Sequence, residues 1–365
     1  MKEYKLSEIL TIKNGRDYKN LKNGLYPVYG SGGLMCTVDN YLYERPSVLL
    51  PRKGTLSNIQ FADSPFWTVD TLYYTEIDTH LADPYYLYYY LKQLDLTRLD
   101  SGTGVPSMTF DSYYNIKVCL PNIDKQRAVG QLLSVVDDKI QLNKRINDNL
   151  EAMAKQLYEY WFVQFDFPNE EGKPYKSSGG AMVWNEKLKR EIPQGWDFCF
   201  LEHLLTIRNG RDHKHLADGI YPVYGSGGEM RKVSEYLYDG ESVLMPRKGS
   251  LNNIMYVNEA FWTVDTMFYS EMKLSNCAKY IYYTIKDIDF TRWNSGTGVP
   301  SMTSSTLYSI KLVKPQSEIL KKFDKMISPL FEHMKQISVQ NAELIKQRDE
   351  LLPLLLNGQA SVNSD

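Results

Sequence analysis

Two pairs of adjacent cations stand at the ends of apolar segments in this chain. Arg52 and Lys53 follow "SVLLP", Arg247 and Lys248 follow "SVLMP", and a glycine closes each pair. Arginine can bind guanine through two parallel hydrogen bonds, and lysine favours phosphate oxygens. The alternative interpretation is a solvated strand end without a ligand. Because both segments place two cations on a predicted turn, we favour contact with DNA.

A glycine-rich segment, "YPVYGSGG", occurs at 26–33 and again, letter for letter, at 221–228. Successive backbone N–H groups beside glycine can bind anions, and glycine permits close approach of a ligand. The alternative is a plain hairpin turn, and no P-loop lysine follows to favour a nucleotide site. The candidates for DNA contact are Tyr29, Gly30, Ser31, Gly32, Gly33, Tyr224, Gly225, Ser226, Gly227 and Gly228.

Two further polar segments are repeated, "NGRD" and "SGTG". The first offers Arg16 and Arg211, although Asp17 or Asp212 could pair with the neighbouring arginine and make the group structural. The second is a polar loop suited to phosphate or base edges, with one arginine just before it in each copy. Its candidates are Arg98, Ser101, Gly102, Thr103, Arg292, Ser295, Gly296 and Thr297. Trp67 and Trp262, within the apolar "FWTVDT", are expected in the core.

Side chains that differ between the copies are candidates for reading different bases. Tyr18 and Asn20 are replaced by His213 and His215, and Leu34 and Cys36 are replaced by Glu229 and Arg231. His213 and Arg231 therefore join the candidates for DNA contact, and the alternative is neutral drift on a surface. The two histidines do not predict a metal site, because their counterparts lack both ligands and no further ligand cluster accompanies them.

These segments belong to a duplicated domain. Residues 10–74 and 205–269 align without a gap, and roughly three in five positions are identical. Each copy is rich in Tyr, Val, Ile and Thr, with Gly, Asn and Pro at short intervals, which is typical of strands and turns. The apolar pattern of 82–95 and 276–289 predicts one short helix in each copy. Each copy is therefore predicted to be a compact, mostly β domain.

A long amphipathic helix is predicted after each domain. Residues 124–162 contain no proline and a single glycine, and at 1.5 Å per residue they would extend about 55–60 Å. Such a helix must bury its apolar stripe, and the other helix is the obvious partner. Asn143 and Asn341 within the stripes would either fix the register or face solvent. The predicted stripes are Leu132, Val136, Lys139, Asn143, Ile146, Leu150, Met153, Leu157 and Tyr160, and Phe323, Ile327, Leu330, Met334, Ile337, Asn341, Leu344, Arg348 and Leu351.

The predicted fold class is α+β, with two similar, mostly β domains, each followed by a long helix. The predicted parts are a domain at 1–120, a helix at 121–164, a linker at 165–194, a domain at 195–314 and a helix at 315–365. Helices paired antiparallel would form a spacer and relate the domains by an approximate two-fold axis. Duplex DNA is a natural ligand for such an arrangement.

Composition sets the broad class of protein. Four cysteines lie far apart with no CxxC, and the N-terminus lacks a secretory signal, so a cytoplasmic location is expected. No apolar segment approaches the roughly 20 residues that span a bilayer. A net charge of −2 argues against a surface coated in positive charge, but a local basic face is sufficient for DNA.

The whole chain resembles the specificity (S) subunit of Type I restriction-modification systems. The similarity rests on "FVQFDFPNEEGKPYKSSGGAMVWNEKLKREIPQGW", on the "YPVYGSGG" and "SVLLPRKG" segments, and on "SGTGVPSM" at the end of each domain. The resemblance implies two target-recognition domains, each reading half of a split double-stranded DNA target, and two modification subunits docked on the helices. It implies that this chain is not an enzyme and holds no cofactor. S-adenosylmethionine would bind the methyltransferase partners, and ATP and Mg would bind two optional restriction subunits.

The likeness of the two copies adds a prediction and leaves two rivals. Similar domains related by a two-fold axis should read similar sequences on opposite strands, so the target should be interrupted and nearly palindromic. An adenine methyltransferase is one rival, because "ADPYY" at 82–86 resembles an acid-proline-tyrosine motif, but the second copy has "NCAKY" there. The other rival is a paired-domain scaffold that does not bind DNA.

Overall fold

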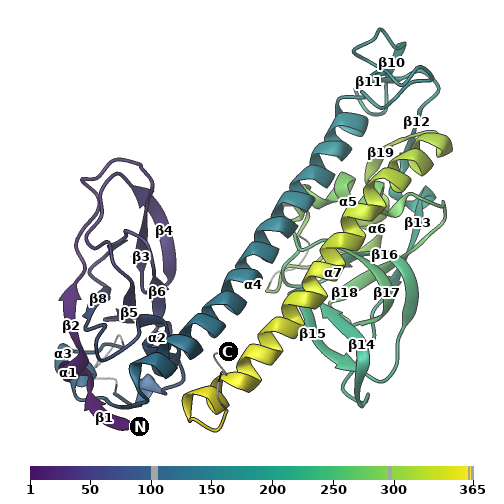
Figure 1. Ribbon diagram of the computed structural model, residues 1–365. Coiled ribbons are helices and arrows are strands. Elements are labelled where there is room, and N and C mark those ends of the chain that lie inside the picture. Colours follow the sequence, from purple (N-terminus) through teal and green to yellow (C-terminus); the bar gives the residue numbers. More distant parts are fainter. Residues whose placement is uncertain (100–105, 295–297, 361, 363–365) are drawn as a thin grey trace. The chain divides into compact units, whose positions relative to one another are not determined.

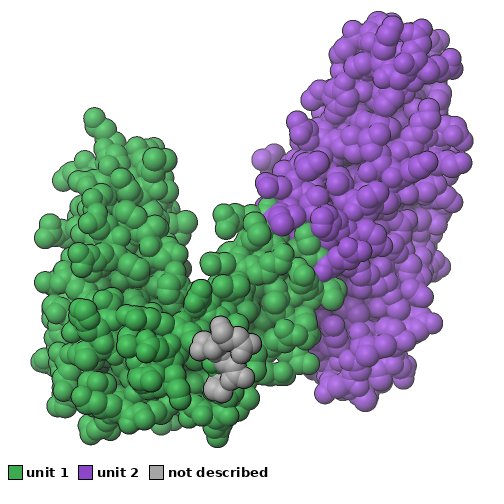
Figure 2. All heavy atoms as spheres, viewed as in Figure 1, with its two compact units in different colours: residues 1–145, 337–365 green, residues 146–336 purple. Residues whose placement is uncertain are grey.

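The computed structural model describes residues 1–99, 106–294, 298–360 and 362, and the chain divides into two compact units. One unit contains 1–145 and 337–365, and the other contains 146–336 (Figure 2). Each unit holds one β-rich domain together with parts of the two long helices, α4 (Ile123–Tyr158) and α7 (Ser317–Leu356) (Figure 1). Within the described chain, no helix is both long and apolar enough to cross a membrane.

The described residues of the first unit's domain form three small sheets and short helices. A four-stranded sheet has the order β2-β8-β5-β6, a three-stranded sheet has the order β4-β3-β7, and β1 pairs with β9. Its elements are β1 (Lys2–Lys5), α1 (Leu6–Ile9), β2 (Leu10–Asn14), β3 (Tyr26–Gly30), β4 (Gly33–Val38), β5 (Ser47–Pro51), β6 (Gln60–Ala62), β7 (Trp67–Thr68), β8 (Leu72–Ile77), α2 (Pro84–Lys92), the 3₁₀ turn η1 (Leu96–Leu99), α3 (Phe110–Tyr114) and β9 (Lys117–Leu120). The predicted strand before Arg52 and the predicted helix within 82–95 are both confirmed.

The second unit repeats this plan with longer strands. One six-stranded sheet has the order β13-β18-β16-β17-β14-β15, and β12 pairs with β19 as β1 does with β9. Its elements are the π turn η2 (Glu159–Val163), β10 (Met182–Asn185), β11 (Arg190–Pro193), β12 (Asp197–Phe200), η3 (Leu201–His203), β13 (Leu205–Asn209), β14 (Asp218–Gly225), β15 (Gly228–Val233), β16 (Tyr238–Pro246), β17 (Met255–Thr263), β18 (Met267–Met272), α5 (Ala278–Lys286), η4 (Phe290–Trp293), α6 (Ser304–Tyr308) and β19 (Lys311–Lys314).

The two long helices pack antiparallel, and a pair of asparagines sets their register. In the first unit the Asn143 amide donates to Asn341 Oδ1 at 2.9 Å, and only 1% and 9% of these residues are exposed. Asp137, earlier in α4, pairs with Arg348, later in α7. Because residue numbers rise along one helix as they fall along the other, the helices are antiparallel. Of the two possibilities for the asparagines, register is the one observed.

The predicted stripe of α7 is confirmed from Phe323 to Arg348 and is wrong at Leu351, which is exposed. The predicted stripe of α4 is wrong by one residue at several places. Leu132, Lys139, Met153 and Tyr160 are exposed, and the next residue in each case is buried: Leu133, Ile140, Ala154 and Trp161. A straight helix drifts relative to a strict seven-residue repeat. Neighbouring apolar residues such as Leu132 and Leu133 leave the choice between them to tertiary packing.

The segment 165–194, predicted as a linker, packs against the core of the second unit. It contains a hairpin of β10 and β11, and buried Phe165 and Phe167 join the core of the second unit. Phe167 stacks on Trp196 with ring centroids 4.9 Å apart. Burial of large aromatic rings explains why this polar, glycine-bearing segment has a defined structure.

Candidate nucleic-acid interface

The glycine-rich segment forms the turn of a β-hairpin in both domains. Gly30 pairs with Gly33 across β3 and β4, and Gly225 pairs with Gly228 across β14 and β15. A serine and a glycine are left as the two turn residues. Gly33 and Gly228 have φ angles of 120° and 118°, which residues with a Cβ rarely adopt. The hairpin is the observed local structure, and its contact with DNA stays a prediction.

An asparagine links each hairpin turn to the loop that carries the two cations. Asn58 Nδ2 donates to the Ser31 carbonyl at 2.7 Å, and Asn253 Nδ2 donates to the Ser226 carbonyl at 2.9 Å. These asparagines follow the "PRKG" segments by a few residues. Sequence reasoning missed them, although their identity in the two copies was a usable signal.

The segment after each "SGTG" loop is bonded through its backbone to the loop that carries the two cations. In the first domain, Met108 N–H donates to the Arg52 carbonyl at 3.0 Å and Gly54 N–H donates to the Pro106 carbonyl at 2.9 Å. The equivalent bonds of the second domain join Met302 to Arg247 and Gly249 to Pro300, both at 2.9 Å. The candidates Ser101, Gly102, Thr103, Ser295, Gly296 and Thr297 lie outside the described residues.

The arginines of "PRKG" lie over aromatic rings, and the lysines are exposed. The Arg52 guanidinium is 5.9 Å from the Tyr73 ring centre, and the Arg247 guanidinium is 6.0 Å from that of Phe268. Arg52 Nη1 also donates to the Asp70 carbonyl at 3.3 Å. An aromatic platform orients a guanidinium without neutralising its charge. Lys53 and Lys248 extend into solvent beside these arginines.

The "NGRD" segments are anchored through tryptophan. Trp67 Nε1 donates to the Arg16 carbonyl at 2.8 Å, and Trp262 Nε1 donates to the Arg211 carbonyl at 2.9 Å. Both indoles are buried, at 8% and 6% exposed, which confirms their predicted place in the core. The aspartates of these segments accept backbone N–H groups two residues later and close local turns. The side chains of Arg16 and Arg211 are exposed on the same loops.

Arg98 and Arg292 are highly exposed but already paired with carboxylates. Arg98 Nε lies 3.1 Å from Asp95, and Arg292 Nε lies 3.1 Å from Asp289. Hydrogen bonds from the Thr291 and Asn252 side chains lower the pKa of Asp289, so its carboxylate is charged at neutral pH. Exposed pairs of this kind are weak, so each guanidinium remains available to phosphate.

Tyr29 and Tyr224 lie behind the hairpin turn and support it. The Tyr29 ring meets the edge of Phe66 at 6.4 Å, and the Tyr224 hydroxyl donates to Glu259 at 2.9 Å. Burial raises the pKa of both tyrosines. These two predicted contact residues are therefore placed where they shape the loop.

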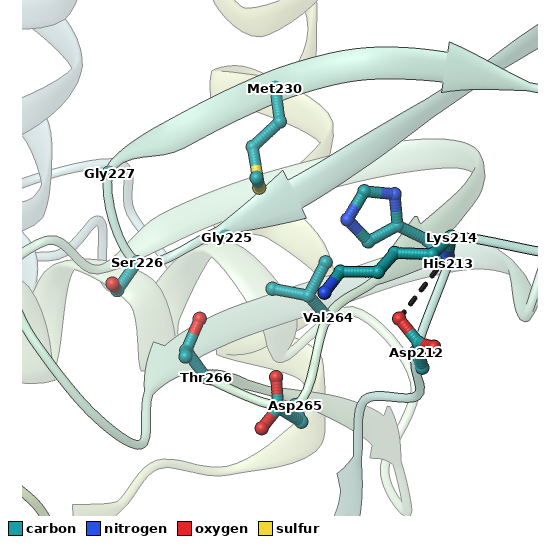
Figure 3. A pocket seen from close by; sticks show the side chains of 10 residues that line it. All are labelled: Asp212, His213, Lys214, Gly225, Ser226, Gly227, Met230, Val264, Asp265 and Thr266. Atoms are coloured by element: carbon teal, nitrogen blue, oxygen red, sulfur yellow. Dashed lines mark hydrogen bonds between the residues drawn. The ribbon is translucent and has the colours of Figure 1, made fainter.

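The two divergent candidates occupy different environments. Arg231 Nη2 donates to the Leu216 carbonyl at 2.5 Å, so part of its guanidinium is already hydrogen-bonded within the domain. His213 lines a hollow of about 590 Å³ beside the hairpin turn (Figure 3). Across this hollow the histidine and its neighbour Lys214 face the Ser226–Gly227 turn. In each domain the hairpin turn, the "NGRD" loop and the "PRKG" loop therefore lie close together, joined by hydrogen bonds to one another or to the same strand end.

Comparison with known proteins places this arrangement in a family. A family model described as the Type I restriction modification DNA specificity domain matches residues 1–152 and 193–341. The chain belongs to this family of specificity subunits. It is the DNA specificity subunit of a Type I restriction-modification system, and the family is non-catalytic.

Individual relatives support the assignment of this specificity subunit to its family. The chain is 24% identical over 354 residues to the MjaIX specificity subunit of Methanocaldococcus jannaschii, covering 88% of this chain and 79% of that protein. It is 23% identical over 343 residues to the HindI specificity subunit of Haemophilus influenzae, covering 74% of each. The crystal structure of the S subunit from M. genitalium superposes with a TM-score of 0.70 at 18% identity, covering 100% of this chain and 96% of that one. This match confirms the predicted fold class.

The motif behind the methyltransferase rival has a structural explanation in this specificity subunit. Asp83 caps α2, since its Oδ1 accepts the Tyr86 N–H at 2.9 Å, and Pro84 occupies the first helical position. The Asp83 N–H in turn donates to Gln126 of α4 at 3.0 Å, so "ADPYY" is a helix start seated on the long helix. Among the described residues, no group of three or more potential metal ligands is found.

Proposed function

We propose that each domain of this specificity subunit reads one half of a bipartite DNA target through a tip cluster. The tip cluster of the first domain consists of the hairpin turn 31–32, the loops carrying Arg16 and Arg52–Lys53, and the segment 106–108. The tip cluster of the second domain consists of 226–227, the loops carrying Arg211 and Arg247–Lys248, and 300–302. Exposed cations, open turns and backbone groups suit phosphate and base edges.

The observation that carries this proposal is the repetition of one geometry. The bonds that tie hairpin turn, cation loop and following segment together recur in both domains at nearly the same lengths. Of these, the asparagine bonds show the largest difference, at 2.7 and 2.9 Å. Two copies of one reading surface should select similar bases. Since antiparallel helices join the copies, we propose half-sites related by inversion, and therefore a nearly palindromic, interrupted target.

The proposed assembly places two modification subunits on the helices, with S-adenosylmethionine bound by those partners. Two ATP-dependent restriction subunits, with Mg, would join for cleavage, and the system would act on DNA in the cytoplasm. The proposed division of labour keeps the boundaries 1–120 and 195–314 for the target-recognition domains, and 121–164 and 315–365 for the helices. The segment 165–194 connects the two halves.

A methylation map tests the proposal. Cells that lack other methylases would express this subunit with its modification partner, and long-read sequencing would locate every methylated adenine. We expect one interrupted motif whose halves are near reverse complements. Unrelated half-sites would contradict the near-palindromic target, and absence of sequence-specific methylation with an intact complex would favour the scaffold alternative.

Salt dependence tests the tip cluster separately. For the complex with the modification subunits, replacing one phosphate-contacting lysine should reduce the slope of log K against log salt by about 0.9. We expect this change for Lys53→Ala and for Lys248→Ala. Lys187→Ala, an exposed lysine of the connecting segment, is the matched control and should leave the slope unchanged. Equal slopes for all three variants would remove the two lysines from the interface.

A further inference from the structure

The residues that line the hollow beside the second hairpin turn differ from their sequence counterparts in the first domain at a single position. The lining residues are Asp212, His213, Lys214, Gly225, Ser226, Gly227, Met230, Val264, Asp265 and Thr266 (Figure 3). The residues 195 positions earlier are Asp17, Tyr18, Lys19, Gly30, Ser31, Gly32, Met35, Val69, Asp70 and Thr71. Nine of the ten pairs are identical, and the exception is Tyr18 against His213. The wall therefore differs between the two domains at one side chain.

The backbone around Tyr18 and the backbone around His213 are held by the same hydrogen bonds. The turn that carries it is closed by Asp17 accepting the Lys19 N–H at 3.1 Å and by Asp212 accepting the Lys214 N–H at 3.2 Å. The tryptophan bonds to the Arg16 and Arg211 carbonyls fix the preceding residues. Tyrosine and histidine thus start from the same backbone position, and what differs is the functional group each presents.

The two side chains are bound to the domain to different degrees. The Tyr18 ring packs against the small core cluster that includes Val28, Trp67 and Val69. His213 Nδ1 is enclosed, and within the described part of the chain it has no hydrogen-bond partner. Because Nδ1 is closed to solvent, a ligand in the hollow cannot bond to that atom directly. His213 as a whole is half-buried and lines the hollow, so the exposed part of its imidazole is what such a ligand can contact.

The chemistry around His213 fits the edge of a base pair. The Lys214 side chain and the Thr266 hydroxyl contribute donors, and Asp212 and Asp265 contribute acceptors, on the wall of an open hollow (Figure 3). The imidazole of histidine can donate from one nitrogen and accept at the other, whereas the larger side chain of tyrosine offers a single hydroxyl group at its end. Base edges in the DNA grooves present donor and acceptor patterns that such groups distinguish.

The other divergent pairs do not share this position. Arg231 Nη2 donates to the Leu216 carbonyl, its Nε is also enclosed without a partner among the described residues, and the residue does not line the hollow. The ring of His215, which does not line the hollow either, meets the edge of Trp262 at 6.3 Å. Glu229 and its counterpart Leu34 are exposed and do not line the hollow. His213 is the divergent residue that the structure places against the otherwise identical wall.

We propose that His213 is a specificity-determining residue of the second domain. It reads a base pair at which the second half-site departs from the inverted repeat of the first, and Tyr18 reads the corresponding base pair in the first domain. This inference rests on the proposed function, because it presumes that the tip clusters read DNA. The base pairs contacted by the nine shared residues would be the same in both half-sites.

Residue exchange tests this inference in the assembled methyltransferase. His213→Tyr makes the ten wall residues of the second domain identical to those of the first, so its methylation map should show a half-site that has become the reverse complement of the first. Tyr18→His should make the opposite change in the first half-site. The preference between the old and new base pair should change by about 10-fold or more. Each variant carries a residue that the other copy accommodates in the same frame, which favours correct folding.

Glu44→Asp is the matched control, because it copies a divergent pair (Asp239 is the counterpart) that is exposed in both domains and lies outside the tip cluster, and it should leave the map unchanged. An unchanged map for both His213→Tyr and Tyr18→His would overturn the inference, as would a wild-type target with exactly inverted half-sites. Loss of all methylation with an intact complex would also overturn it, since the claim concerns selection. If the wild-type half-sites are unrelated, the near-palindromic proposal fails, while a change confined to the second half-site in His213→Tyr would still support the role of His213.

Discussion

A buried lysine in the second unit provides a quantitative test of how that domain is fixed to its helix. Lys279 of α5 is 4% exposed, and its ammonium lies 2.6 Å from Glu241 and 2.9 Å from Asp324. Glu241 belongs to β16 and Asp324 to α7, so one cation joins the sheet, the short helix and the long helix. The side chain of Asp324 is 16% exposed and that of Glu241 is 30% exposed.

Lys279→Met keeps the length of the side chain and removes its charge. Two carboxylates are then left facing each other in a mostly buried site. Removing one partner of a buried ion pair costs about 3–5 kcal/mol. Water can reach Glu241 in part, so we expect the lower end, about 3 kcal/mol. For a unit of this size, 1 kcal/mol corresponds to a change in Tm of about 2–4 °C, which predicts a decrease of about 6–12 °C.

Denaturant and thermal unfolding of the full chain, followed by circular dichroism, would measure this change. Lys155→Met is the matched control, because Lys155 pairs with Asp287 in the same unit at 2.6 Å but with the two side chains 41% and 62% exposed. Such an exposed pair contributes about 0–1 kcal/mol. If Lys279→Met costs no more than Lys155→Met, the reasoning from burial is wrong.

Three further predictions concern packing and ionisation. Gly130→Ala should destabilise the first unit by about 1–3 kcal/mol in denaturant titrations, because a Cβ there would approach Asp83 Oδ1 within 2.5 Å; an unchanged midpoint would contradict this contact. Asn143→Leu should cost about 1–3 kcal/mol by leaving the buried Asn341 Oδ1 without its donor, and adding Asn341→Leu should recover part of that loss rather than double it. Burial raises the pKa of the Cys277 thiol from 9.0 to about 12, so the folded state keeps a proton that the unfolded state loses. The stabilising contribution of the protonated Cys277 thiol is fully present below pH 9 and declines as the pH rises toward 12. The free energy of unfolding of the Cys277→Ala variant should therefore decrease less steeply than that of the wild type between pH 9 and pH 12.

Much of the fold was predictable because the domain sequence occurs twice in the chain, so each pattern could be compared with its second copy. The repeated "SVLLPRKG" and "SVLMPRKG" segments predicted strands that end in turns, and the structure has both strands. The apolar spacing of α7 predicted its buried face from Phe323 to Arg348. The same reasoning was one residue off along α4, because side chains such as Leu132 and Leu133 are both apolar and only contacts with the rest of the unit choose between them.

The candidate site was predictable in part for the same reason. Arg52, Lys53 and the glycine-rich turn were recognisable as a chemistry-bearing set, and the structure brings them together in each domain. Asn58 and Asn253, which connect the turn to the cation loop, were missed because a lone polar residue in a loop carries no periodic signal. Each of these asparagines is also present at the equivalent position of the other copy, and that identity could have drawn attention to them.

The sequence by itself determined the duplication, the two long amphipathic helices and the family, since these depend on order, period and identity along the chain. Only the tertiary structure decided that Asn143 and Asn341 face each other, and that His213 stands alone as the changed residue in an otherwise identical wall. The physical reason is that a contact between residues far apart in the chain depends on how whole elements pack. Neither local propensity nor spacing contains that information.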